Sequence, residues 1–205
     1  MGKGRLEAFS DGVIAIAITL MVLELKVPHA QTLEALTSIL PGLFSYVLSF
    51  LYLGIYWNNH HHLFHAASKV SGMTLWANLH LLFWLTLVPF VSGWAGETGF
   101  GPWPVAAYGI VLLMAALSWQ ILVRVLVACH GKDSPLSAAI GRGFKEWIST
   151  ILYVLGIVIS LAGPALNLSE RWTPVAGFLI YAVVAAIWFV PDRRIERALQ
   201  ASHAH

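Results

Sequence analysis

Charged residues and cysteines are scarce in this sequence. Of its 205 residues only 11% are charged, whereas 58% are hydrophobic. This balance is far from that of a soluble globular domain and close to that of a multi-span membrane protein. The one cysteine, Cys129, excludes an intramolecular disulfide framework and any multi-cysteine metal site within one chain. The net charge of +2 and the lack of a long basic run also argue against nucleic acid as a partner.

Six apolar stretches are long enough to cross a bilayer, whose hydrocarbon core of about 30 Å requires roughly 20 helical residues. Prolines and glycines separate them. The first stretch is too long for the apolar region of a signal peptide and is predicted to be retained as a span. We therefore predict an all-α integral membrane protein, with residues 1–205 forming a single six-helix transmembrane domain. The predicted spans are 9–27, 39–62, 72–94, 104–129, 147–166 and 172–190.

The distribution of Lys and Arg predicts the orientation of these spans. If the amino terminus is cytoplasmic, ten of the twelve basic residues lie inside or at the inner membrane edge. Only Lys26 and Arg171 lie on the other side. Such a positive-inside bias predicts a multi-pass protein of the cell membrane with both termini in the cytoplasm. The ten inner residues are Lys3, Arg5, Lys69, Arg124, Lys132, Arg142, Lys145, Arg193, Arg194 and Arg197.

Polar residues concentrate where the first three spans would meet the inner face. Polar groups at membrane depth are expensive and normally satisfy one another. The sequence therefore predicts one inner polar network shared by three helices, with Asp11 pairing with a histidine or asparagine of the second or third span. Its candidate members are Ser10, Asp11, Asn58, Asn59, His60, His61, His62, Asn78 and His80.

The first span carries an apolar stripe at helical spacing. Its members recur at intervals of four, three, four, three and four residues, which places them along one side of a helix. Packing against a neighbouring helix of the same chain would account for such a stripe. Alternatively, symmetry-related copies bring it together around an axis, because hydrophobic constrictions are a known means of gating conduction. The stripe comprises Phe9, Val13, Ile16, Leu20, Leu23 and Val27.

Polar residues flank this stripe at both ends. Asp11 lies at the inner end and Glu24 at the outer end, where a cation channel needs a hydrated mouth. Thr19 precedes Leu20, so its hydroxyl could face the constriction or bond to a carbonyl of its own helix, such as that of Ala15. Glu24 could equally pair with Lys26 or face solvent.

Three motifs resemble the signature of the transmembrane protein 175 family, whose members are potassium channels of lysosomes and prokaryotes. The first is Arg5-x-x-x-Phe9-Ser10-Asp11-Gly12 at the start of an Ile/Ala/Thr/Leu-rich helix. The second is Trp57-Asn58-Asn59-His60-His61, and the third comprises Asn78 and Pro89-Phe90. Six spans in about 200 residues also match the size of the prokaryotic single-repeat members.

The resemblance implies a homotetramer in which the first helix of each subunit lines a potassium pore. The constricting apolar positions of the family then fall on Ile16, Leu20 and Leu23, and its selectivity threonine falls on Thr19. Its signature Arg and Asp fall on Arg5 and Asp11, which would hold the inner helix ends together. No cofactor is expected, only permeant potassium ions.

A potassium preference must then arise without the Thr-Val-Gly-Tyr-Gly carbonyl filter, which this sequence lacks. An apolar ring forces partial dehydration, and potassium loses water at lower cost than sodium. Each factor of ten in selectivity requires only about 1.4 kcal/mol of barrier difference. We therefore expect real but imperfect selectivity.

Two other functions fit parts of the sequence. Asp11 and the inner histidines could form the relay of a cation or proton transporter. His61 and His65 are spaced i, i+4 and could share the metal of a membrane enzyme, with His60, His62, His80 or His130 adding ligands. No His-Glu-x-x-His motif supports this second alternative, and no metal site is predicted.

Overall fold

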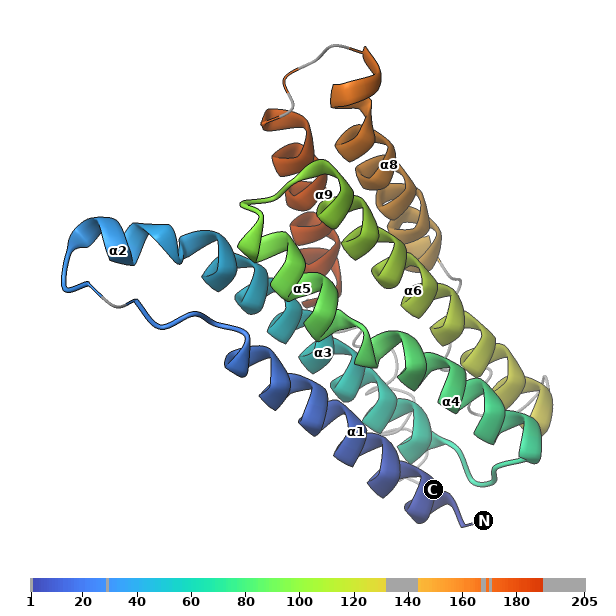
Figure 1. The fold of residues 1–205 in the computed structure, drawn as a ribbon. Coiled ribbons are helices and arrows are strands. Elements are labelled where there is room, and N and C mark those ends of the chain that lie inside the picture. Colours follow the sequence, from blue (N-terminus) through green and yellow to red (C-terminus); the bar gives the residue numbers. More distant parts are fainter. Residues whose placement is uncertain (1, 29, 132–143, 167–168, 170, 190–205) are drawn as a thin grey trace.

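The computed structural model describes residues 2–28, 30–131, 144–166, 169 and 171–189. It confirms an all-helical protein with six helical segments long and apolar enough to span a membrane (Figure 1). Several predicted features lie outside the described residues: the end of the last span at position 190, and the basic residues Lys132, Arg142, Arg193, Arg194 and Arg197.

The helices agree with the predicted spans to within a few residues at most ends. The main differences are that the first helix starts and ends earlier than predicted and that the second span is longer. Val27, the last residue of the predicted stripe, therefore lies beyond the first helix. A short helix before the second span was not predicted. The helices are α1 (Lys3–Leu23), α2 (Leu33–Ser38), α3 (Leu40–Ala66), α4 (Gly72–Thr86), α5 (Val88–Glu97), α6 (Pro102–His130), α8 (Phe144–Leu166) and α9 (Trp172–Phe189).

The third span is divided into α4 and α5 at Leu87. Pro89 is one of the first two residues of α5 and has no N–H to donate to the preceding turn, so the helix cannot continue unbroken through this point. The short helix α2 begins at an N-cap, where the Thr32 hydroxyl accepts a hydrogen bond from the Ala35 N–H at 3.2 Å. None of the residues of α2 is buried, and the helix projects from the bundle on the arm that joins α1 to α3 (Figure 1).

Small residues allow the helices to approach closely. A Cβ atom on Gly96 of α5 would lie 2.6 Å from the Cα of Gly42 in α3, and one on Gly177 of α9 would lie 2.7 Å from the carbonyl oxygen of Gly156 in α8. Such contacts between backbones are typical of helix packing in membranes. In contrast, α1 lies at the margin of the bundle and packs mainly on α3, α4 and α5 (Figure 1).

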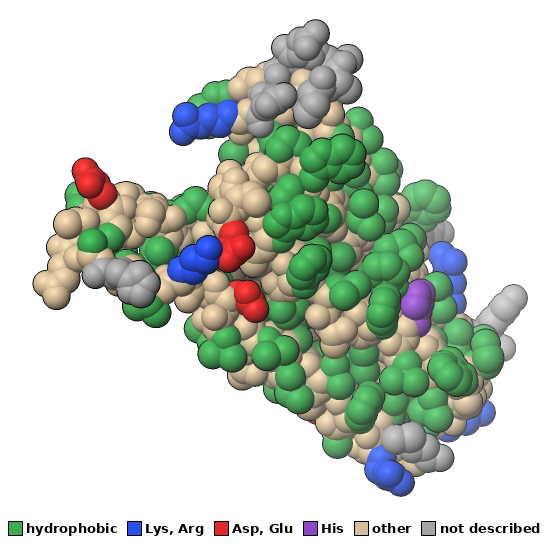
Figure 2. Space-filling model, in the orientation of Figure 1, with side chains coloured by type: hydrophobic (Ala, Val, Ile, Leu, Met, Phe, Trp, Pro, Cys, Tyr) green, Lys and Arg blue, Asp and Glu red, His purple; other side chains and the backbone are tan. Residues whose placement is uncertain are grey.

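Three chain segments meet at one end of the bundle. The Lys3 ammonium at the start of α1 donates to the Ala67 carbonyl at 2.9 Å. His130, the last residue of α6, accepts a hydrogen bond at Nε2 from the Ser68 N–H at 3.0 Å. At the opposite end, Lys26 and Glu97 form an ion pair of 3.0 Å. Between the ends the visible face is predominantly hydrophobic (Figure 2), as expected of a surface that contacts lipid or other subunits.

Candidate functional site

The helix α1 has two different apolar faces. One is buried against the rest of the chain and consists of Leu6, Ser10, Ile14, Ala17 and Met21. The other contains the predicted constriction residues, which the chain leaves uncovered: Ile16 is 60% exposed, Leu20 48% and Leu23 76%. Val13 of the predicted stripe packs against the core of the subunit, but Ile16, Leu20 and Leu23 are not used for packing within it. An uncovered apolar face on a helix of a membrane protein is available to lipid or to another protein surface.

The polar residues near this face adopt local arrangements. The Thr19 hydroxyl donates to the Ile16 carbonyl of its own helix at 2.9 Å. Of the two alternatives considered for Thr19, the structure therefore has the bond to its own helix, with Ile16 rather than Ala15 as the acceptor. Glu24 is exposed at the end of α1 beside Gly93 of α5. Because Lys26 pairs with Glu97, the possible pairing of Glu24 with Lys26 is not formed.

Ser10, His60 and Asn78 form a continuous hydrogen-bonded chain that joins α1, α3 and α4. The Asn78 amide nitrogen donates to the Ser10 hydroxyl at 2.9 Å, and Ser10 in turn donates to the Leu6 carbonyl at 2.9 Å. The amide oxygen of Asn78 lies 2.8 Å from His60 Nε2. All three side chains are buried, with at most 1% exposed. These three of the predicted network residues therefore do meet, and they fix the register of α1 on its neighbours.

The geometry of this chain determines the tautomer of His60. An amide oxygen only accepts hydrogen bonds, so His60 Nε2 must be the donor. Nδ1 of a neutral His60 is then an acceptor, and within the described part of the chain it is buried without a partner. The ring packs on Phe64, with 4.5 Å between the ring centroids. The site therefore accommodates a neutral imidazole in an apolar surrounding.

Asp11 has a different partner from the one predicted. Its carboxylate accepts a hydrogen bond from the Trp57 indole N–H at 3.1 Å, which ties α1 to α3 a second time. Arg5, Asn58 and His61 are exposed on the surface of the chain. The His61 ring stacks on that of His65, with 6.1 Å between their centroids.

His80 belongs to a separate contact. Its Nδ1 lies 3.2 Å from the Ser118 hydroxyl of α6, and its Nε2 accepts a hydrogen bond from the Trp84 indole at 3.1 Å. His80 does not join the buried chain of Ser10, His60 and Asn78, because residues two apart on a helix do not share a face. Asn78 and His80 therefore point to different neighbours, and the same spacing separates Asn58 from His60. The single predicted network is thus divided into a buried chain, the Asp11–Trp57 pair and the His80 contact.

No group of three or more His, Cys, Asp or Glu side chains is placed to hold a metal ion among the residues that the structure describes. The stacked pair of His61 and His65 is consequently without a third ligand of these types there. A metal centre of the kind used by membrane enzymes normally needs three or more protein ligands. The geometry therefore gives no support to the metal-enzyme alternative.

Two residues that organise this end of the protein were not identified from the sequence as members of the site. Lys3 caps carbonyls at the end of α3, and Trp57 holds Asp11. Trp57 is part of the motif that carries the family resemblance, so its position beside Asn58 was a usable signal. Lys3 carries no sequence signal of this role other than its charge.

Comparisons with known proteins identify the relatives of this chain. Residues 5–89 match the sequence model of the family described as endosomal/lysosomal potassium channel TMEM175. A protein of Chryseobacterium sp. (strain P1-3) named a potassium channel is 53% identical over 200 residues, which cover 98% of this chain and 99% of that protein. The human endosomal/lysosomal proton channel TMEM175 is 35% identical over 96 residues, which cover 40% of this chain and 19% of the human protein.

A solved structure supports the same relationship. The crystal structure of a lysosomal potassium-selective channel TMEM175 homologue from Chamaesiphon minutus superposes with a TM-score of 0.72. The two proteins are 26% identical, and the match covers 92% of this chain and 96% of the other. The chain therefore belongs to the TMEM175 family, and the members of this family are ion channels rather than enzymes.

Proposed function

We propose that this protein is a cation channel with a real but imperfect preference for potassium over sodium. In this proposal four copies assemble around an axis, and α1 of each copy lines the pore. Rings of Ile16, Leu20 and Leu23 form a hydrophobic constriction. Glu24 lies at the outer mouth, and the permeant ions are the only ligands required.

The observation that carries this proposal is the uncovered apolar face of α1. Ser10, Ile14 and Ala17 anchor the helix to its own subunit, while Ile16, Leu20 and Leu23 face away from it. Because α1 packs at the margin of the bundle, it is accessible to another subunit without any rearrangement of the fold. The bacterial relatives are named potassium channels, which supports an ion-conducting function for this chain.

A constriction without oxygen ligands selects ions by the cost of dehydration. An isoleucine ring forces an ion to lose part of its hydration shell, which is cheaper for potassium than for the smaller sodium ion. The Thr19 hydroxyl is bonded to the Ile16 carbonyl, so the threonine side chain is held against the backbone of α1 at the level of the proposed constriction. We infer that Thr19 tunes the width of the pore at this level.

We further propose that the protein resides in the cell membrane with both termini in the cytoplasm. Lys3 and Lys69 lie at the end of the bundle where α1 begins, while Lys26 lies at the opposite end near Glu97. This distribution follows the positive-inside rule if the α1 end is cytoplasmic. The buried Ser10–Asn78–His60 chain and the Asp11–Trp57 pair then stabilise the inner helix ends.

Purified protein in a planar bilayer is expected to give discrete unitary currents in potassium chloride. The ion flux through one open pore should exceed transporter turnover by orders of magnitude, because the proposed path has no step that must be reset for each ion. Bi-ionic recording with potassium on one side and sodium on the other gives the selectivity from the reversal potential. Saturable uptake without unitary events would contradict the proposal and favour a transporter that uses Asp11 and the inner histidines.

A further inference from the structure

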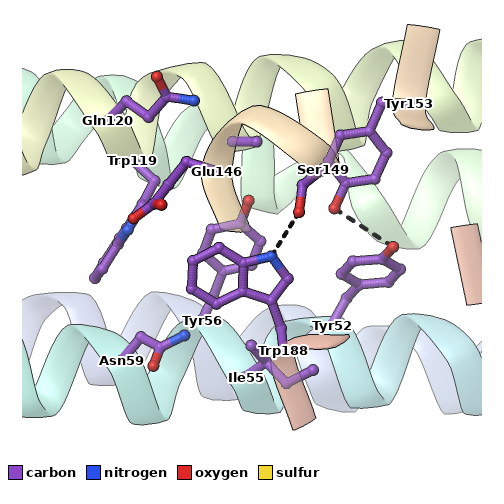
Figure 3. Close-up of a pocket in the computed structure, with 11 residues that line it drawn as sticks. Tyr52, Ile55, Tyr56, Asn59, Trp119, Gln120, Glu146, Ser149, Tyr153 and Trp188 are labelled. Atoms are coloured by element: carbon purple, nitrogen blue, oxygen red, sulfur yellow. Dashed lines mark hydrogen bonds between the residues drawn. The ribbon is translucent and has the colours of Figure 1, made fainter. Parts of the chain in front are cut away.

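A second site lies within the subunit, away from the uncovered face of α1. A cavity of about 30 Å³ opens between α3, α6, α8 and α9 (Figure 3). Its walls are mainly aromatic, and the polar side chains Asn59, Gln120 and Glu146 lie toward one end of it, opposite Tyr52 and Tyr153. A space of this size accommodates about two water-sized groups.

Most polar groups around the cavity are already paired within the protein. The Trp188 indole donates to the Ser149 hydroxyl at 2.8 Å, and Ser149 donates to the Lys145 carbonyl at 2.8 Å. The Tyr153 hydroxyl contacts that of Tyr52 at 3.4 Å, and Tyr52 donates to the Tyr181 carbonyl at 2.6 Å. These bonds hold the walls in place and leave no free polar atom on Ser149 or Tyr52 that a ligand would have to satisfy.

The Gln120 side chain also forms hydrogen bonds within the protein. Its amide nitrogen lies 3.5 Å from the Thr150 hydroxyl, and its amide oxygen lies 3.5 Å from the guanidinium of Arg124. Arg124 does not line the cavity. Gln120 therefore connects α6 to α8 at the rim and keeps the cation of Arg124 bonded to its own helix.

Four lining side chains form no side-chain hydrogen bond among the residues that the structure describes. They are the hydroxyl of Tyr56, the amide of Asn59, the indole N–H of Trp119 and the carboxylate of Glu146. Glu146 is half-buried, and the carboxylate forms no ion pair in that part of the chain. A partly desolvated carboxylate is stabilised by a cation that also donates hydrogen bonds.

We propose that this cavity binds a small primary ammonium ion, of which methylammonium is the simplest. Such an ion has two non-hydrogen atoms, matching the size of the space. Its three N–H groups correspond in number to the acceptors offered by Glu146, Tyr56 and Asn59. Trp119 and Trp188 also line the cavity, and a cation is attracted to aromatic rings such as theirs. Because the site lies between α3, α6, α8 and α9, it does not depend on where ions cross the protein.

Thermal unfolding of the purified full-length protein tests this site. In HEPES buffer, which contains no primary amine, about 50 mM methylammonium chloride should raise the melting temperature by about 4 °C, as expected at a concentration some tenfold above the dissociation constant. Equal concentrations of sodium or potassium chloride should not. Glu146→Gln should weaken binding about tenfold by removing the charge-assisted hydrogen bond, and thereby abolish most of the shift.

Two controls make the result specific. Glu34→Gln removes a carboxylate of α2, far along the chain from the cavity, and should retain the full shift. Potassium flux through Glu146→Gln in liposomes should equal that of the unaltered protein, which shows that the variant is folded. The proposal is overturned if methylammonium gives no shift, if potassium or sodium gives the same shift, or if Glu146→Gln retains it.

Discussion

Ile16→Asn is expected to lower the preference for potassium over sodium by about tenfold, equivalent to roughly 1.4 kcal/mol of barrier difference. Ile16 is 60% exposed on the face of α1 that we propose lines the pore. Four asparagine side chains at one level would keep the constriction hydrated and offer oxygen ligands to either ion. Dehydration would then no longer distinguish the two cations, and conductance should rise. Bi-ionic reversal potentials of the purified variant measure this change.

The chain offers a closely matched control. Ile151 of α8 is also 60% exposed, so Ile151→Asn introduces the same side chain on a surface that does not belong to α1. This variant should leave the reversal potential unchanged. An unaltered reversal potential in Ile16→Asn, or an equal change in both variants, would be incompatible with a constriction at Ile16.

Asn78→Leu is expected to lower the free energy of unfolding by about 2 kcal/mol, the cost of leaving a buried donor without an acceptor. Leucine has a similar size but cannot accept the hydrogen bond from His60 Nε2, which lies 2.8 Å from the Asn78 amide oxygen. Ser10 retains its bond to the Leu6 carbonyl, so most of the lost stability comes from the unpaired N–H of His60. The unfolding midpoint of the protein in detergent should fall by about 6 °C.

A second substitution tests whether the orphaned histidine causes this loss. His60→Phe in the Asn78→Leu background removes the unpaired donor, and replacing both partners of a buried hydrogen bond by apolar groups is often nearly neutral. The double variant should therefore regain part of the stability lost by Asn78→Leu. Asn58→Leu, which alters an exposed amide of α3, serves as the control and should change the midpoint little. Additive losses in the double variant would show that the hydrogen bond between His60 and Asn78 is not the stabilising contact.

The helices were predictable because the bilayer imposes a length and an apolar composition on each span. The break at Leu87 follows from Pro89, which is visible in the sequence. The short helix α2 was not predicted, since six residues carry too little periodicity to distinguish a helix from a loop. Its N-cap at Thr32 becomes recognisable only once the helix is known.

The polar network was predicted in part. Sequence places Ser10, His60 and Asn78 at neighbouring helix ends, and membrane burial then favours their pairing. Which polar residue meets which depends on the rotation of each helix about its axis, which polarity alone does not fix. His80 and Asn58 therefore seemed equivalent to their neighbours two residues away but face other surroundings, and Asp11 binds the indole of Trp57 rather than a histidine.

The central claim, that the uncovered face of α1 lines the ion pathway, is tested most directly by cysteine modification. Cys129→Ser removes the only natural cysteine. In that background, Leu23→Cys treated with a cationic methanethiosulfonate should lose nearly all potassium flux, because four bulky charged adducts would occupy one level of the pore. Val154→Cys on the exposed surface of α8 should keep its flux after the same treatment. Full modification of Leu23→Cys, established by mass spectrometry, with undiminished flux would contradict the account.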